Sequence, residues 1–397
     1  MSISKSFHRP KKAQWSYWER ELGWDRTFAS YLTYRPLERN YDFVVVGAGF
    51  TGLSAAYHLA KRHSKAKIAL LDRYLPPLGA STRNAGFACI GTVGEFIADS
   101  QLEQPECVWD RMHERWKGLT LLRSILGDQV IGYESLGGHE LFTEEEEFER
   151  VATYLASCNT ALKQRTGLDQ WYNLARINGY NAIQMPREGQ LQPAKAWARF
   201  AQLCEQIGIH LACGRKLVDM TRKMDGLSLT VEEGAKRSHQ QFHSSSVILA
   251  TNAFSKALRR DVSVSPGRGL VLLTKALNSQ PWQGTFHAQR GYIYFRNVGT
   301  DRLLLGGGRH MDVSGEKTTQ FGVNTEIKAF LLRYMKEILV IDPSEVEFEW
   351  SGIMGFTPDK NPVIRTELSG NIAIAVGLSG MGVALSTELG RKAAELF

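Results

Sequence analysis

The most constraining feature of the chain is a glycine-rich turn between a short apolar run and a helical pattern. Residues 42–46 (DFVVV) are predicted as a buried strand, and residues 51–62 (TGLSAAYHLAKR) as a helix with one apolar face. A second apolar run, residues 67–71 (KIALL), ends at Asp72. This order predicts a βαβ unit, in which a helix joins two parallel strands.

Three glycines in this turn, Gly47, Gly49 and Gly52, give the pattern GxGxxG. The first permits a tight turn, the second lets the backbone approach a diphosphate, and the third lets helix and strand pack closely. The helix N-terminus then offers free N–H groups to phosphate oxygens. Asp72 follows Gly52 by 20 residues and suits hydrogen bonds to a ribose diol. The unit therefore predicts a dinucleotide site, without distinguishing FAD from NAD.

The rest of the chain mixes predicted helices and strands. Helices are expected at 144–165, at 193–207 with Pro193 in the first turn, at 325–339 and at 382–396. Strands are expected at 215–222, 227–232, 240–249, 268–276, 291–297, 302–308 and 371–376. The fold class is predicted to be α/β, with a discontinuous Rossmann-like cofactor domain and an α+β second domain that contains an antiparallel sheet.

Length and composition limit the remaining possibilities. A chain of 397 residues suits two domains, and 43% hydrophobic with 22% charged residues is typical of globular proteins. No apolar run approaches the ~20 residues of a membrane span, so no transmembrane segment is expected, and the N-terminus lacks the features of a secretory signal. The five cysteines are irregularly spaced and form no CxxC, which indicates neither a disulfide framework nor a metal site. A reducing cytoplasm is the expected location.

The first 39 residues are predicted to form a basic and aromatic arm. The net charge is +7, and residues 1–40 contain eight basic and four acidic side chains. Such an arm attracts nucleic acid or folds against the body of the protein. Its many aromatic residues favour docking: Trp15, Tyr17, Trp18, Trp24, Phe28, Tyr31 and Tyr34.

From about residue 40 to 397 the chain resembles the FAD-dependent amine and amino-acid oxidoreductases related to D-amino-acid dehydrogenase, glycine oxidase and sarcosine oxidase. The likeness rests on several short blocks. They are GASTRNAGF at 79–87, GQLQP at 189–193, the strand around 216–220, ATNAF at 250–254 and GLSGMG at 377–382. Within this group the likeness is greatest to gamma-glutamylputrescine oxidases, through YFRNVGTDRLLLGGG at 294–308, WSG at 350–352 and SYW at 16–18.

The resemblance implies a glutathione-reductase-type FAD domain and an amino-acid-oxidase-like substrate domain. The FAD domain is expected to comprise residues 40–105, 186–265 and 345–397, and the substrate domain residues 106–185 and 266–344.

The resemblance also implies a set of site residues. Arg83, Asn84, Tyr292 and Tyr294 are the implied catalytic residues, beside the reactive flavin ring or on the wall of the substrate cavity. The implied FAD contacts are Gly47, Ala48, Gly49, Phe50, Thr51, Gly52, Asp72, Arg73, Ser81, Thr82, Arg83, Asn84, Ala85, Gly86, Val218, Ala250, Thr251, Asn252, Gly352, Gly377, Ser379, Gly380, Met381, Gly382 and Val383.

At several positions this chain departs from its relatives. Met354 stands where many amino-acid oxidases place an arginine, and Ala384 where sarcosine oxidases use a lysine, so both familiar carboxylate anchors are missing. Arg83, Arg296 and Arg309 stay open as alternative anchors. Leu304 stands at the position of the lysine that promotes reaction with oxygen. Gly352 and Thr82 occupy the positions of the cysteine and histidine that hold flavin covalently, so non-covalent FAD is expected.

The expected function is FAD-dependent oxidation of the C–N bond of an amine or amino acid, by hydride transfer to flavin N5. Oxygen or another electron acceptor would then regenerate the flavin, as in an oxidase or a dehydrogenase. Two alternatives stay open at this point: a flavoprotein dehydrogenase of a hydroxy acid or polyol phosphate, and a basic nucleic-acid-binding protein with a structural nucleotide fold.

Overall fold

The computed structural model describes residues 15–23, 35–75, 77–233, 238–367 and 370–397. The chain divides into two compact units, and each unit is built from separated segments. The first unit contains residues 1–84, 193–267 and 353–397, and the second contains residues 85–192 and 268–352. Residues 85–105, 186–192 and 345–352 therefore belong to the second unit, in contrast to the predicted boundaries.

The first unit is built on a mostly parallel sheet with the strand order β17-β18-β11-β1-β2-β8. Strand β10 pairs with β11 and β9 in antiparallel fashion. The strands are β1 (Asn40–Val46), β2 (Ile68–Asp72), β8 (His210–Cys213), β9 (Arg215–Lys223), β10 (Gly226–Glu233), β11 (Ser238–Leu249), β17 (Val363–Thr366) and β18 (Ile372–Val376).

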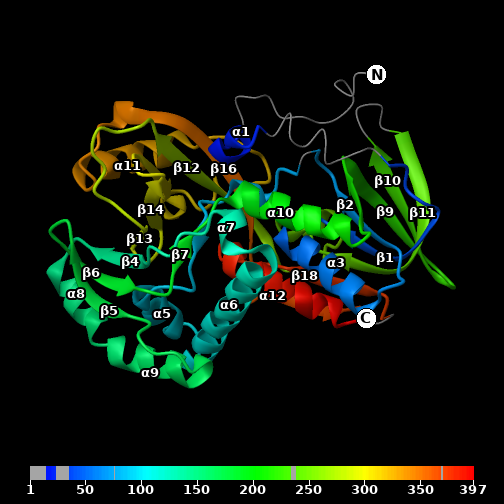
Figure 1. Ribbon diagram of the computed structural model, residues 1–397, viewed down its shortest axis with the longest axis horizontal. Helices are drawn as coiled ribbons and strands as arrows, with labels where there is room; N and C mark the ends of the chain where they lie inside the picture. Colours follow the sequence, from blue (N-terminus) through cyan, green and yellow to red (C-terminus); the bar gives the residue numbers. More distant parts are fainter. Residues whose placement is uncertain (1–14, 24–34, 76, 234–237, 368–369) are drawn as a thin grey trace. The chain divides into compact units, whose positions relative to one another are not determined.

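The parallel pairs bring four carboxyl ends to one edge of this sheet. Val46 at the end of β1 is in register with Leu249 of β11 and with Leu71 of β2, and Leu249 is in register with Ile374 of β18. Ligands of such sheets bind beyond the carboxyl ends of the strands. The predicted strand–helix–strand unit at residues 42–72 is confirmed and lies at the centre of the sheet (Figure 1).

The helices of the first unit are α1 (Tyr17–Glu21), α3 (Phe50–Arg62), α4 (Ala80–Arg83), α10 (Pro193–Gln206), α12 (Gly382–Ala394) and the 3₁₀ helix η3 (Asn252–Ala257). Helices α3 and α12 lie side by side (Figure 1). A Cβ atom at Gly390 of α12 would come within 2.4 Å of the Thr51 carbonyl oxygen, and the Ser54 hydroxyl donates to the Thr387 carbonyl oxygen at 2.6 Å. Because these contacts need the small residues Gly390 and Ser54, the sequence of both helices fixes their close packing.

The second unit is built on an eight-stranded sheet with the order β16-β12-β15-β14-β13-β4-β6-β5. Its strands are β4 (Gly138–Phe142), β5 (Asn173–Ile177), β6 (Tyr180–Met185), β12 (Ser265–Thr274), β13 (Thr285–Ala288), β14 (Ile293–Val298), β15 (Arg302–Gly307) and β16 (Val346–Phe356). Neighbours β12–β15, β14–β15, β13–β14, β4–β6 and β5–β6 run antiparallel, whereas β13 and β4 run parallel. The sheet is thus mixed, with a parallel pair at β13 and β4.

Helices and one small sheet complete the second unit. A two-stranded sheet joins β3 (Phe87–Ala88) to β7 (Gly189–Gln190). The helices are α5 (Val93–Ser100), α6 (Pro105–Leu126), α7 (Asp128–Ile131), α8 (Glu145–Ala152), α9 (Leu155–Thr166), α11 (Thr325–Glu337) and the 3₁₀ helices η4 (Arg309–Met311) and η5 (Pro343–Glu345). Residues 144–165, predicted as one helix, form α8 and α9 with a break at Thr153 and Tyr154.

Part of the N-terminal arm packs on the first unit. Ser16 and Glu19 form a reciprocal capping box that starts α1, and Trp15 and Trp18 are buried. The Trp18 indole donates to the Asn84 carbonyl oxygen at 2.9 Å. The expected docking is therefore found at Trp15 and Trp18, whereas Trp24, Phe28, Tyr31 and Tyr34 lie outside the described residues.

Among the described residues, no helix combines the length and apolarity that a bilayer crossing requires.

Candidate functional site

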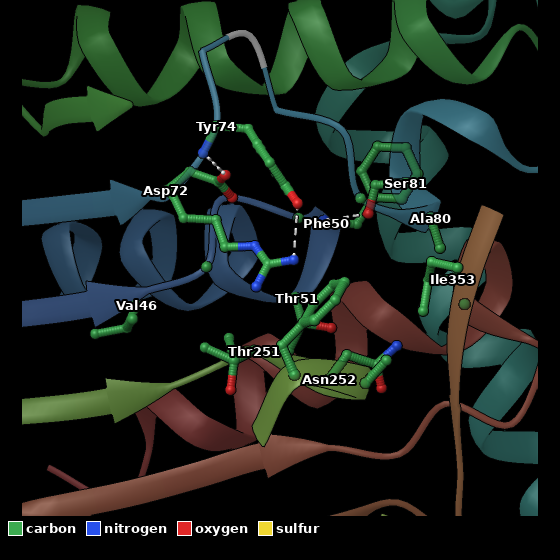
Figure 2. Close-up of a pocket in the computed structure, with 18 of the residues that line it drawn as sticks. Val46, Phe50, Thr51, Asp72, Tyr74, Ala80, Ser81, Thr251, Asn252 and Ile353 are labelled. Atoms are coloured by element: carbon green, nitrogen blue, oxygen red, sulfur yellow. Dashed lines mark hydrogen bonds between the residues drawn. The ribbon is translucent and has the colours of Figure 1, made fainter. Parts of the chain in front are cut away.

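A cavity of about 330 Å³ lies in the first unit at the carboxyl edge of the parallel sheet. Its wall comes from the ends of β1 and β2, the start of β9, the residues after β11 and the starts of α3, α4 and α12 (Figure 2). Fifteen of the predicted cofactor contacts line it: Gly47, Gly49, Phe50, Thr51, Asp72, Arg73, Ser81, Asn84, Val218, Ala250, Thr251, Asn252, Gly380, Gly382 and Val383. Segments that lie far apart in the sequence therefore form one site.

The glycine turn has the local geometry that its spacing predicts. Gly47 has φ +106°, and a Cβ atom there would lie 2.5 Å from the Ala250 carbonyl oxygen. A Cβ atom at Gly52 would lie 1.8 Å from the Gly47 carbonyl oxygen. Neither position accepts a side chain, so the turn stays tight and β1 passes directly into α3.

The start of α3 presents backbone donors to the cavity. Gly49 is the N-cap residue and makes no side-chain capping bond, because it has no side chain. The Phe50 amide donates to the Ser81 hydroxyl at 2.9 Å, which ties α3 to α4 (Figure 2). Amides in the first turn of a helix have no partner within the helix and carry the positive end of its dipole. This end of the cavity suits an anion such as a diphosphate.

Asp72 connects the second strand to the glycine turn. Its carboxylate accepts hydrogen bonds from the Ala48 amide at 3.0 Å and from the Tyr74 amide at 2.9 Å. Burial raises the pKa of Asp72 above its ordinary value, and the two amides oppose that rise. A carboxylate fixed in this way, on the wall of the cavity, is suited to accept hydrogen bonds from sugar hydroxyls.

A mixed apolar and cationic wall lies beyond Asp72. The guanidinium of Arg73 lies 3.7 Å from the centre of the Phe254 ring and donates to the Tyr74 hydroxyl at 2.9 Å. Val218, Phe254 and Leu258 supply apolar surface to the same cavity. Flat apolar groups of this kind hold a heteroaromatic ring such as adenine.

A second helix begins at the cavity. Gly380 has φ +88°, and nothing lies within 4 Å of a Cβ atom built on it. Helix α12 starts at Gly382, and its N-cap residue Met381 makes no side-chain capping bond. The cavity is therefore lined by the starts of two uncapped helices, which provides two separate places for negative charge.

Asn252 and Ser379 hold the loops around this second helix start. The Asn252 side-chain oxygen accepts from the Gly377 amide at 2.9 Å, and the Ser379 hydroxyl accepts from the Thr357 amide at 3.2 Å. Asn252 and Ser379 both adopt positive φ, 43° and 47°. Gly377 and Ser379 therefore position the cavity wall without lining it.

The remaining predicted contacts do not line the cavity. Ala48, Gly52, Thr82, Arg83, Gly377, Ser379 and Met381 are in the first unit without lining the cavity, and Ala85, Gly86 and Gly352 belong to the second unit. Sequence reasoning missed other lining residues, among them Tyr74, Lys216, Phe254, Leu258, Ile353 and Met354. Tyr74 directly follows the predicted contact Arg73, and Phe254 ends the block ATNAF at 250–254, so these neighbours were the available signal.

Arg83 has a different position from the one expected of a catalytic residue. Its guanidinium lies 2.9 Å from the Glu19 carboxylate of α1, and both side chains are almost fully buried. Glu19 also accepts from the Thr82 hydroxyl at 3.3 Å. Arg83 therefore joins α4 to α1 as half of a buried ion pair, and we do not propose it as a catalytic residue.

The other three residues expected to be catalytic lie in two places. Asn84 lines the cavity, and its side-chain nitrogen donates to the Ala80 and Ser81 carbonyl oxygens at 3.0 Å, which closes α4. Tyr292 and Tyr294 belong to the second unit. Tyr292 is exposed and packs on the His310 ring, whereas Tyr294 packs on Phe87. Burial raises the pKa of Tyr294 to about 12.

Known proteins match this chain along nearly its whole length. The family model described as DAO, FAD dependent oxidoreductase, matches residues 42–396. A probable oxidoreductase OrdL from Haemophilus influenzae is 26% identical over 383 residues, covering 89% of this chain and 82% of that protein. Monomeric sarcosine oxidase from Bacillus sp. (strain NS-129) is 23% identical, covering 91% of this chain and 93% of that protein.

A solved structure shares the fold. Glycine oxidase from Geobacillus kaustophilus superposes with a TM-score of 0.69 at 22% identity, covering 90% of this chain and 95% of that one. The cavity offers what FAD requires: two uncapped helix starts, a fixed carboxylate and an apolar wall. Together with the family match along residues 42–396, this shows that the chain belongs to the DAO family of FAD-dependent oxidoreductases.

Proposed function

We propose that this enzyme oxidises the C–N bond of an amine or amino acid, with FAD bound non-covalently in the cavity of the first unit. The observation that carries the cofactor assignment is the pair of uncapped helix starts, α3 and α12, on one cavity wall. The first-turn amides of α3 would hold the diphosphate, and Asp72 would accept hydrogen bonds from the ribose. FAD, when bound, supplies the acceptor for a hydride equivalent.

The start of α12 would support the chemical step. Reduction adds negative charge to a flavin ring, and backbone N–H groups directed at that charge lower its energy. Gly382 and Val383 line the cavity in the first turn of α12, where amides have no partner within the helix. The open space beside Gly380 lets the backbone approach a ring closely.

Tyr294 is proposed as the polar group that orients the substrate. Its hydroxyl is protonated at neutral pH and can donate a hydrogen bond, and burial, which raises its pKa to about 12, extends this to higher pH. Tyr292 is 48% exposed and is the weaker candidate.

Among the possible donors, we favour amines that lack a carboxylate beside the nitrogen. Where related enzymes use an arginine to bind a substrate carboxylate, this chain has Met354, which lines the cavity. Where others use a lysine, it has Ala384, which is buried. A cavity without these cations loses the charge-assisted hydrogen bonds that select amino acids.

The test is anaerobic reduction of the bound flavin by a panel of amines, amino acids and hydroxy acids, followed by absorbance. We expect amines to bleach the flavin fastest, and Y294F to slow bleaching more than Y292F. Bleaching by hydroxy acids alone would overturn the proposal. Acid precipitation should leave the yellow colour in solution, because the chain has Thr82 and Gly352 at the positions that bind flavin covalently in relatives.

The electron acceptor and the location complete the proposal. Leu304, at the position of the oxygen-promoting lysine, is fully buried in β15, which favours an acceptor other than oxygen. Slow reoxidation of the bleached enzyme by air would support this, and rapid reoxidation would contradict it. All five cysteines are free thiols, which is consistent with a cytoplasmic location.

A further inference from the structure

The second unit brings together a cysteine, a glutamate and a histidine that the sequence spaces far apart. The Cys89 sulfur, one carboxylate oxygen of Glu188 and one ring nitrogen of His287 all lie within 4.8 Å of one another. All three residues are buried, with 5%, 2% and 9% of their surface exposed. The irregular cysteine spacing gave no sign of this cluster, because only Cys89 contributes to it.

One strand pairing and one ring contact assemble the cluster. Ala88 of β3 is the antiparallel partner of Gly189 of β7, so Cys89 and Glu188 lie next to each other just beyond this small ladder. His287 lies on β13, where the Phe87 ring packs edge-on against it at 5.1 Å. The three residues are thus held by backbone that the fold fixes on both sides.

Glu188 is anchored through one oxygen only. Its Oε1 accepts from the Ile90 amide at 2.7 Å and from the Gly91 amide at 3.4 Å. Its Oε2 has no hydrogen-bond partner among the described residues. A Cβ atom at Gly138 would lie 2.5 Å from Oε2, so a glycine is needed there for the carboxylate to keep this position.

His287 presents a second buried atom without a partner. Its Nε2 makes no hydrogen bond within the described residues, although the side chain is nine-tenths buried. Leaving a buried polar atom unpaired costs about 1–3 kcal/mol, and this cluster contains two such atoms. A ligand that both atoms bind would remove that cost.

We propose that Cys89 Sγ, Glu188 Oε2 and His287 Nε2 form a site for a divalent transition metal of the zinc type. Sulfur, imidazole nitrogen and carboxylate oxygen are the three ligand classes that zinc accepts in proteins. A thiolate and a carboxylate together carry two negative charges, which a divalent cation balances within a buried site. Three protein ligands leave a fourth position for water or another small ligand.

None of the three residues lines the cofactor cavity. His287 is the strand partner of Tyr294, the residue proposed to orient the substrate, and the Phe87 ring packs on both, so the metal site lies beside that proposed position. The metal would join the β3–β7 pair to β13. Its binding would therefore stabilise the second unit, since metal affinity adds to folding free energy when the ligands come from separate segments.

The test uses the flavin-loaded full-length protein, stripped with a chelator and then supplied with Zn²⁺. Elemental analysis after gel filtration should give one zinc per chain, and X-ray absorption at the zinc edge should show one sulfur at about 2.3 Å and nitrogen or oxygen at about 2.0 Å. C89S, E188Q and H287Q should each lower the zinc affinity at least about tenfold. C107S is the matched control, because Cys107 is an exposed thiol of the same unit.

Three results would overturn the proposal. They are a wild-type protein that retains no zinc, bound zinc without a sulfur neighbour, and zinc bound equally by wild type and C89S. If the variants fail to fold, the zinc-edge X-ray absorption spectra of the wild-type protein and of C107S still test the proposal, because they report the metal ligands directly. Flavin content measured in the same samples distinguishes a failure of the metal proposal from a failure of the proposed FAD-dependent function.

Discussion

At the scale of single residues, Asp72 links the glycine turn to the cavity. Its two carboxylate oxygens already accept the Ala48 and Tyr74 amides, so its orientation is fixed before any cofactor binds. Preorganised acceptors of this kind contribute to affinity because little order is lost on binding. The role of Asp72 is therefore testable by changing one oxygen to nitrogen.

We expect D72N to weaken FAD binding about tenfold to a hundredfold, because a charged acceptor becomes neutral and one backbone amide loses its partner. D42N is the matched control, since Asp42 also accepts a backbone amide, that of Lys67 at 2.7 Å, outside the cavity. Flavin fluorescence titration of both apoproteins measures the difference. Burial raises the pKa of Asp72, so wild-type affinity should fall as the pH drops toward that raised value, and D72N should lack this fall. Equal affinities for D72N and D42N would contradict the assignment.

The ion pair between Glu19 and Arg83 acts on stability. Their side chains are 0% and 2% exposed, so E19Q leaves a buried guanidinium without its counter-charge. We expect E19Q to lower the free energy of unfolding by about 3 kcal/mol. E38Q, which breaks the exposed pair of Glu38 with Lys67, should cost less than about 1 kcal/mol. Urea unfolding of the two variants tests this. Similar losses in the free energy of unfolding would show that the buried pair stabilises the fold no more than the exposed pair does.

At the scale of elements, the close packing of α3 and α12 brings the starts of two helices to one cavity. The glycine before α12 is the point where backbone and ligand would meet. Gly380 has φ +88° and Gly208, just after α10, has φ +90°, and a Cβ atom on either would meet nothing within 4 Å. Only Gly380 lines the cavity.

These two glycines give a matched pair of variants. G380A and G208A should each lower the free energy of unfolding of the apoprotein by about 1 kcal/mol, since alanine is strained at positive φ. Only G380A should also weaken FAD binding, about tenfold, because its methyl group enters the space of the ligand. Thermal unfolding of the apoproteins and FAD titration separate the two effects. Loss of FAD affinity in G208A as well would indicate a general effect of backbone strain.

The elements that the sequence predicted best are those whose apolar pattern is undisturbed. Strands β1 and β2 and helix α10 are continuous apolar runs or stripes, and their predicted bounds agree closely with the structure. Helix α6 was not predicted, because its buried face includes Arg111 and Arg115. These arginines pair with Asp99 and Glu95, and such long-range partners cannot be read from local periodicity.

The distinction between local and long-range partners also explains which site residues could be predicted from the sequence. Gly47, Gly49 and Asp72 were predictable because one local turn determines their roles. The ion pair of Arg83 could not be predicted, because its partner Glu19 lies 64 residues away on α1. The cluster of Cys89, Glu188 and His287 was missed for a similar reason, since the β3–β7 pairing and the contact of Phe87 with His287 bring together residues far apart in the sequence.

At the scale of the whole molecule, the proposed cofactor cavity and the proposed metal site belong to different units. All residues that line the cavity belong to the first unit, and all three proposed metal ligands belong to the second. The chain crosses between the units at residues 84–85, 192–193, 267–268 and 352–353. Two of these crossings lie within strands β12 and β16, so the units are joined by continuous backbone of regular structure.

Removal of FAD should therefore affect the two units unequally. Binding at a hundredfold excess over Kd stabilises the folded state by about 2.7 kcal/mol, and the local part of this effect falls on the segments that contact the ligand. Hydrogen exchange of apoprotein and holoprotein should show protection on FAD binding at residues 47–54, 72–74, 250–258 and 378–386, which contain most of the lining residues. Helix α9, which contributes none, gives the reference level. If neither 47–54 nor 378–386 gains protection, FAD does not bind in this cavity, whatever substrate the enzyme oxidises.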